Sequence, residues 1–62
     1  MEDKNMFKIE IETGNAAFED DRNMELARIL RQIAERLENG EDAGRVLDIN
    51  GNKVGSFEME ED

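Results

Sequence analysis

The shortness of this chain constrains its fold more than any other feature does. Its 62 residues are enough for one domain. A chain of this length buries only about 60% of the surface that its unfolded form exposes, so it is marginally stable as a monomer. Small domains are commonly stabilised by disulfides, metal ions or oligomerisation. Cys and His are absent, which removes disulfides and the two commonest zinc ligands. Stability must therefore come from close packing or from a partner, which includes a second copy of the chain.

The segment 6–13 alternates between apolar and charged residues. Its apolar members are Phe7, Ile9 and Ile11. The residues between and after them are Lys8, Glu10 and Glu12. Alternation with a period of two, in a segment rich in β-branched residues, predicts a strand with one buried face. The Gly14-Asn15 pair predicts a turn directly after it.

The segment of about 21–39 has the periodicity of an amphipathic helix. Its large apolar residues recur at spacings of three and four, at Leu26, Ile29, Leu30, Ile33 and Leu37. Asp20 and Asp21 are suitable N-terminal caps, and Gly40 is suited to the left-handed position after the last turn. Phe18 is the only large apolar residue in the preceding connection, and we expect it to close one end of the core.

The segment of about 44–59 predicts a β-hairpin around Asn50-Gly51-Asn52. A two-residue turn at Gly51-Asn52 would place Ile49 opposite Val54 and Arg45 opposite Glu58. In that register, one group of apolar residues faces away from Leu47 and Ile49; its members are Val46, Phe57 and Met59. Two alternatives follow. Either a bulge at Gly55 returns Phe57 to the core, or the sheet carries apolar residues on both faces.

These elements predict a single α+β domain over residues 1–62 with the order β-α-β-β. One amphipathic helix would pack on a three-stranded, mostly antiparallel sheet, which is the minimal two-layer arrangement. If the second arm of the hairpin lies in the centre, every neighbouring pair of strands is antiparallel. We prefer that strand order.

The charge of the chain limits its partners. Seventeen acidic residues against eight basic ones give a formal net charge of -9, which disfavours DNA, RNA and anionic membranes and favours basic proteins. His, Cys and Tyr are absent, and Thr13 and Ser56 are the only hydroxyl side chains. We therefore expect no enzyme activity, no cofactor and no metal site. No apolar run reaches the roughly 20 residues of a membrane span, and no signal peptide is recognisable. A cytoplasmic location is expected.

One set of carboxylates is the leading candidate for a binding surface. It consists of Glu10 and Glu12 on the first strand and Glu58 and Glu60 on the last. Side chains two residues apart on a strand lie roughly 6.6–6.8 Å apart, close to the phosphate repeat of DNA. Such a face could imitate a phosphate backbone and occupy the DNA-binding groove of a nucleic-acid-binding protein, as a DNA mimic. The alternative is an ordinary solvated face whose charges prevent edge aggregation.

Two further surfaces follow from the hairpin. Val46, Phe57 and Met59 would form an apolar patch on the outer sheet face, through which the chain could form a homodimer. Asp48, Asn50 and Asn52 resemble the start of an EF-hand calcium loop. However, Lys53 and Met59 stand where that motif requires Gly and Glu. A hairpin tip without an ion explains the same residues.

The chain also resembles an uncharacterised family of short proteins from bacterial genomes, prophages and related mobile elements. The resemblance spans Phe7 to Gly55 and rests on four stretches: Phe7-x-Ile9-x-Ile11-x-Thr13-x-Asn15-Ala16-Ala17-Phe18, Ala27-Arg28-Ile29-Leu30-Arg31, Leu37-Glu38-x-Gly40 and Asp48-x-Asn50-Gly51-Asn52-x-Val54-Gly55. The resemblance implies a function only by analogy with other small proteins of mobile elements. Small proteins of mobile elements often bind host machinery, so the resemblance favours a protein-interaction module.

Overall fold

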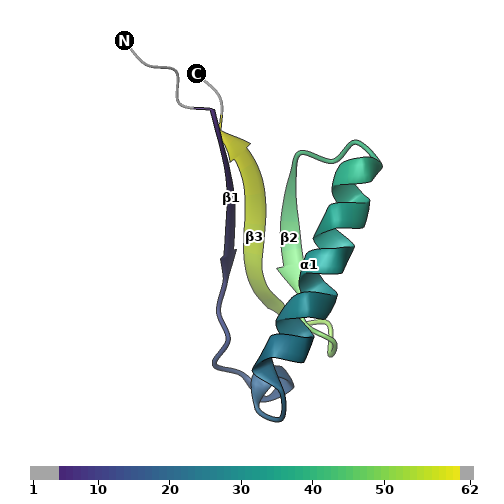
Figure 1. Ribbon diagram of the computed structural model, residues 1–62. Coiled ribbons are helices and arrows are strands. Elements are labelled where there is room, and N and C mark those ends of the chain that lie inside the picture. Colours follow the sequence, from purple (N-terminus) through teal and green to yellow (C-terminus); the bar gives the residue numbers. More distant parts are fainter. Residues whose placement is uncertain (1–4, 61–62) are drawn as a thin grey trace.

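The computed structural model describes residues 5–60, so residues 1–4 and 61–62 of the predicted domain lie outside the described part. The elements are, in order, β1 (Met6–Ile11), a 3-10 turn η1 (Ala16–Phe18), α1 (Arg22–Glu38), β2 (Ala43–Leu47) and β3 (Lys53–Glu60). The three strands form one antiparallel sheet in the order β1-β3-β2 (Figure 1). The predicted α+β class, the order β-α-β-β and the central position of the second hairpin arm are confirmed.

The ends of α1 follow from local hydrogen bonding. The side chain of Asp21 accepts a hydrogen bond from the Met24 N–H at 3.1 Å and caps the first turn. Gly40 follows the last turn with a φ of 95°, the left-handed conformation that glycine adopts most readily. Both predicted signals are confirmed. Within residues 5–60, no helix has the length and apolar character that crossing a bilayer requires.

The register of the β2–β3 hairpin differs from the predicted one. Arg45 lies opposite Ser56, not Glu58, and Val46 lies opposite Gly55. The predicted two-residue turn is wrong because the loop has three residues, Ile49, Asn50 and Gly51, between the paired residues Asp48 and Asn52. The Asp48 N–H donates to the Asn52 carbonyl oxygen at 2.9 Å, and the Gly51 N–H donates to the Asp48 carbonyl oxygen at 3.0 Å. Gly51, with a φ of 86°, occupies the left-handed position that such a three-residue loop requires.

A bulge in this hairpin decides which residues form the core. The register shifts between Val46 and Leu47, where β3 contributes one extra residue, Val54. The predicted alternative of a bulged strand that buries Phe57 is therefore confirmed, one residue away from Gly55. The buried core consists of Phe18, Ile29, Ile33, Val46, Val54 and Phe57.

The predicted apolar interface is wrong for two of its three residues. Val46 and Phe57 are only 3% and 1% exposed, because the bulge turns them toward α1, and no second molecule can contact them. Phe57 lies beneath the guanidinium of Arg36, which is 4.8 Å from the centre of its ring. Met59 alone remains exposed, at 41%.

The helix covers only part of the sheet. Figure 1 shows α1 beside β2, with β1 on the far side of β3. Ile11 packs against the core at the end of β1, whereas Phe7 and Ile9 each remain 37% exposed. The predicted strand is therefore present, two residues shorter than the predicted range 6–13, but its apolar face is only partly buried.

The burial of Phe57 predicts a large difference between two neighbouring substitutions. Phe57→Ala should lower the free energy of unfolding by about 3–5 kcal/mol because it leaves a cavity under α1. That loss is comparable to the whole stability of a small domain. Met59→Ala should cost less than about 1 kcal/mol because Met59 lies outside the buried core. Urea unfolding followed by circular dichroism measures both. Equal losses would contradict the core described above.

Candidate functional site

The sheet face that points away from α1 carries most of the charged residues that the sequence singled out. Because side chains alternate along each strand, burial of Phe57 places the neighbouring positions on the opposite side. We call this side the outer face. Its members are Met6, Lys8 and Glu10 of β1, Ala43 and Arg45 of β2, and Ser56, Glu58 and Glu60 of β3. No described helix covers it (Figure 1), which leaves it free for a partner.

The structure brings together three of the four predicted glutamates. Glu10, Glu58 and Glu60 lie on the paired strands β1 and β3. Glu12 lies just beyond the end of β1, where its N–H still donates to the Val54 carbonyl oxygen at 2.8 Å. The expected acidic surface therefore exists over two strands, with Glu12 at its margin.

A lysine lies among these carboxylates. Lys8 is opposite Glu58, and its Nζ is 3.2 Å from the carboxylate of Glu60. The hydrogen bond and the negative charge of Glu60 raise the pKa of Lys8, and Glu10 and Glu58 add to the effect. Arg45 adds a second cation at the β2 side, across Ser56 from Glu10. The outer face thus carries an excess of carboxylates but is not uniformly acidic.

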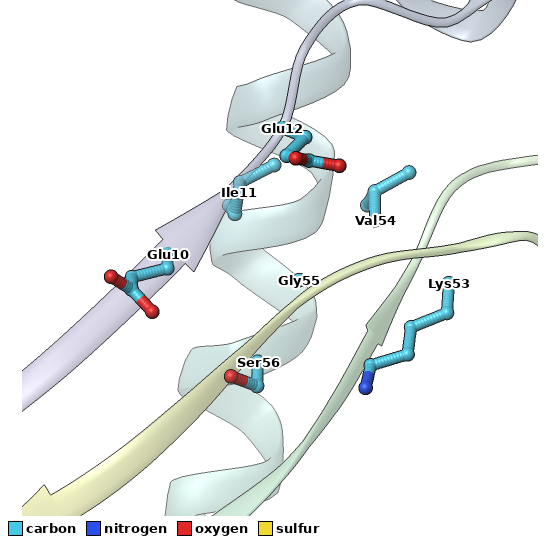
Figure 2. A pocket seen from close by; sticks show the side chains of 7 residues that line it. All are labelled: Glu10, Ile11, Glu12, Lys53, Val54, Gly55 and Ser56. Carbon is cyan, nitrogen blue, oxygen red and sulfur yellow. The ribbon is translucent and has the colours of Figure 1, made fainter.

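A shallow hollow of about 480 Å³ lies on the outer face where β1 and β3 meet. Its lining residues are Glu10, Ile11, Glu12, Lys53, Val54, Gly55 and Ser56. Figure 2 shows Glu10 and Glu12 on the β1 side and Lys53 on the β3 side. Gly55 has no room for a side chain, because an added Cβ would overlap the carbonyl oxygen of Glu10.

The chemistry of the hollow is that of ion pairing. Its carboxylates can accept hydrogen bonds from a cationic side chain, and Lys53 can donate to an acidic one. Ser56 is the only hydroxyl among the lining residues. Among residues 5–60, Ser56 forms no hydrogen bond with a side chain that could activate it as a nucleophile.

The hairpin loop, considered above as a calcium site, is held by the buried Asp48. Its carboxylate accepts hydrogen bonds from the N–H groups of Asn50 and Asn52, each at 2.9 Å, and from the side-chain amide of Asn15 at 2.7 Å. The pKa of Asp48 is lowered, first by the Asn52 N–H. A cation would have to displace these donors, so the contacts favour a structural role. In the described part of the chain, no three potential metal ligands of the types His, Cys, Asp and Glu lie together.

A second buried carboxylate fastens the hairpin to the helix. Glu25, 7% exposed, accepts hydrogen bonds from Arg28 at 2.9 and 2.8 Å and from the Ile49 N–H at 3.0 Å. Arg28 is the main reason that the pKa of Glu25 is lowered. The sequence contained one signal for this burial, because Glu25 precedes Ile29 and Ile33 at successive spacings of four. A glutamate at that position normally indicates an exposed residue, so the contact with Ile49 was not predicted.

The two buried carboxylates predict an acid-sensitive fold. Their pKa values are lowered on folding, so the stabilisation is complete above the unfolded pKa, about 4, and is lost as the pH falls through the folded values. Asp48→Asn should therefore melt at a lower temperature than the parent at about pH 6, and this difference should shrink toward about pH 3. Melting curves by circular dichroism test this.

Glu19→Gln is the matched control for that experiment. It also removes one negative charge, but its exposed side chain takes no part in the Asp48 network. It therefore reports the general effect of reducing the charge of an acidic chain. A difference between parent and Asp48→Asn that stays constant over the whole pH range would contradict the proposed role of the Asp48 carboxylate.

Comparisons with protein-family models, curated proteins and solved structures found no match. The resemblance to short prophage and mobile-element proteins therefore stays a prediction. The candidate surfaces for function are those of the described residues themselves: the outer face with its three glutamates, and the edges of the sheet.

Proposed function

We propose that this protein is a non-enzymatic interaction module that binds a basic protein partner through its outer face. The observation that carries the proposal is the gathering of Glu10, Glu58 and Glu60 on the uncovered side of two neighbouring strands. Carboxylates fixed on a sheet can form charge-assisted hydrogen bonds with Arg and Lys side chains of a partner. The net charge of -9 would also speed the encounter with a basic protein.

The positions of the cations refine the kind of partner. Lys8 and Arg45 interrupt the carboxylates, so the outer face presents separate acidic positions and not a continuous phosphate-like row. This arrangement favours a basic peptide segment with spaced Arg or Lys residues over a DNA-binding groove. The partner can still be a nucleic-acid-binding protein, because basic segments are common in such proteins.

The proposal includes a binding role, a cytoplasmic location and an origin in a mobile element. A chain without His, Cys or Tyr has few groups for nucleophilic or acid–base chemistry near neutral pH, which supports a binding role over an enzymatic one. We place the protein in the cytoplasm, where basic nucleic-acid-binding proteins are plentiful. An origin in a prophage or mobile element agrees with this role by analogy alone.

Glutamine substitutions on the outer face test the proposal. The triple variant Glu10→Gln, Glu58→Gln, Glu60→Gln should bind a synthetic arginine-rich peptide about tenfold more weakly than the parent, because three ion pairs of modest strength are lost. Fluorescence anisotropy with labelled peptide at near-physiological salt measures the affinity. Amide NMR shifts of the parent should concentrate on β1 and β3.

A second triple variant provides a matched control. Glu19→Gln, Glu35→Gln, Glu38→Gln removes the same three charges from exposed positions away from the outer face. It should retain affinity within about threefold of the parent, since only long-range attraction is reduced. If both triple variants weaken binding equally, the attraction belongs to the net charge, and the proposed outer-face site is wrong.

A further inference from the structure

Strand β1 is the least protected element of the sheet. It is an edge strand, paired with β3 along one side only. Every residue from Met6 to Glu10 is exposed, including Phe7 and Ile9, whose side chains lie on the α1 side of the sheet. Unpaired backbone groups and half-exposed apolar side chains on one edge form a template for pairing with another strand.

The backbone groups at this edge can be identified from the register. The Glu12 N–H donates to Val54 of β3, and in an antiparallel pair the residues that bond to the partner alternate along the strand. Residues of the same parity as Glu12 therefore point their backbone groups toward β3. Phe7, Ile9 and Ile11 point theirs toward the free edge.

The opposite edge of the sheet, formed by β2, is less open to pairing with another strand. On β2, the guanidinium Nη1 of Arg36 donates to the Arg45 carbonyl oxygen at 2.6 Å. This contact from α1 occupies an edge acceptor of β2 and hinders the approach of another strand. In Figure 1 no described element lies along the free edge of β1. The sheet thus has one obstructed edge and one open edge.

We propose that β1 pairs with β1 of a second copy of this chain, antiparallel and with Ile9 opposite Ile9 of the second copy. The pairing would satisfy the edge groups of Phe7, Ile9 and Ile11 with about six backbone hydrogen bonds. Two three-stranded sheets would become one continuous antiparallel sheet with two-fold symmetry.

Charge complementarity selects this register. With Ile9 opposite its own copy, Lys8 of each chain lies opposite Glu10 of the other, in the non-hydrogen-bonded pairs where side chains approach most closely. A shift by two residues in one direction places Lys8 opposite Lys8, and a shift in the other direction places Glu10 opposite Glu10. Both shifted registers place two like charges directly opposite each other, which the proposed register avoids.

The same register also joins apolar residues on the α1 side. Phe7 lies opposite Ile11 of the second copy, and Ile9 faces its own equivalent. Met59, opposite Phe7 within each chain, extends this strip across β3. Because the two-fold axis is perpendicular to the sheet, both helices lie on the same side and flank the strip. The occupant proposed for the uncovered part of β1 is therefore a second β1.

The dimer shares Glu10 with the proposed binding surface, but it is tested separately from the binding function. The outer faces of both copies remain exposed, since the contact is made along an edge. The tests below use the protein alone and need no basic partner, so failure of one proposal leaves the other unaffected.

Amide exchange combined with mass measurement tests the pairing directly. Analytical ultracentrifugation of the full chain should show a concentration-dependent shift from one copy to two. At protein concentrations above the midpoint of that transition, the Phe7, Ile9 and Ile11 amides should exchange at least about tenfold more slowly than below it. The Lys8 and Glu10 amides, already bonded to β3, should change little. A chain that remains monomeric at millimolar concentration, or a dimer without protection at Phe7 and Ile9, overturns the proposal.

A proline pair separates the edge from the fold. Ile9→Pro removes an N–H that points to the free edge, so it should abolish the dimer while the helical circular dichroism signal is retained. Glu10→Pro removes an N–H that points to β3 and should damage the fold itself. If Ile9→Pro unfolds the chain, the charge variants below decide; a folded Ile9→Pro variant that still forms the dimer contradicts the proposal.

A charge-reversal pair tests the register. Lys8→Glu places Glu opposite Glu10, and Glu10→Lys places Lys opposite Lys8, so each variant alone should be monomeric. Mixing them restores opposite charges at both positions and should restore a heterodimer. Glu60→Gln is the control, because it removes the partner of Lys8 within the chain without changing the edge. Single variants that dimerise as well as the parent, or a mixture that stays monomeric, overturn the register.

Discussion

The hydrogen bonds of the Asp48 carboxylate hold the turn on which the rest of the structure depends. They stabilise a three-residue loop and thereby set the pairing between β2 and β3. A slip of one residue in a strand would move its side chains to the opposite face. Phe57 and Val46 are buried because this loop, together with the bulge at Val54, turns both toward α1. A buried charge at a hairpin tip thus determines which apolar residues form the core.

The position of α1 follows from contacts on one side of the helix. The Glu25 carboxylate accepts a hydrogen bond from the Ile49 N–H, and Arg36 contacts both Phe57 and the Arg45 carbonyl oxygen. These contacts draw the helix over β2 and β3, and β1 is left largely uncovered. A single helix of this size is too narrow to cover three strands. The open β1 edge is therefore a consequence of the same contacts that build the core, and it is where we place a second copy.

The two proposals assign different roles to the same strand. Within one chain, Lys8 and Glu10 belong to the outer face, where Lys8 lies between Glu58 and the free edge. In the proposed dimer, Glu10 of the second copy continues that row on the other side of Lys8. Opposite charges would then alternate across the junction, and the remaining carboxylates would stay available to a basic partner. Charges on an edge strand commonly prevent aggregation, and here the same charges would favour one pairing register over the others.

The sequence by itself determined the element types, their order and the helix caps, because periodicity, Asp21 and Gly40 act through local backbone geometry. It also indicated the outer position of Glu10, since alternation along a strand is local, whereas the side on which Glu58 and Glu60 lie depended on whether β3 carries a bulge. Tertiary structure decided the hairpin register, the burial of Phe57 and Glu25, and the exposure of Phe7 and Ile9. These depend on hydrogen bonds between residues distant in the chain, such as Asn15 to Asp48 and Ile49 to Glu25. Side-chain patterns along one segment carry no record of such partners, which is why only the assembled structure shows them.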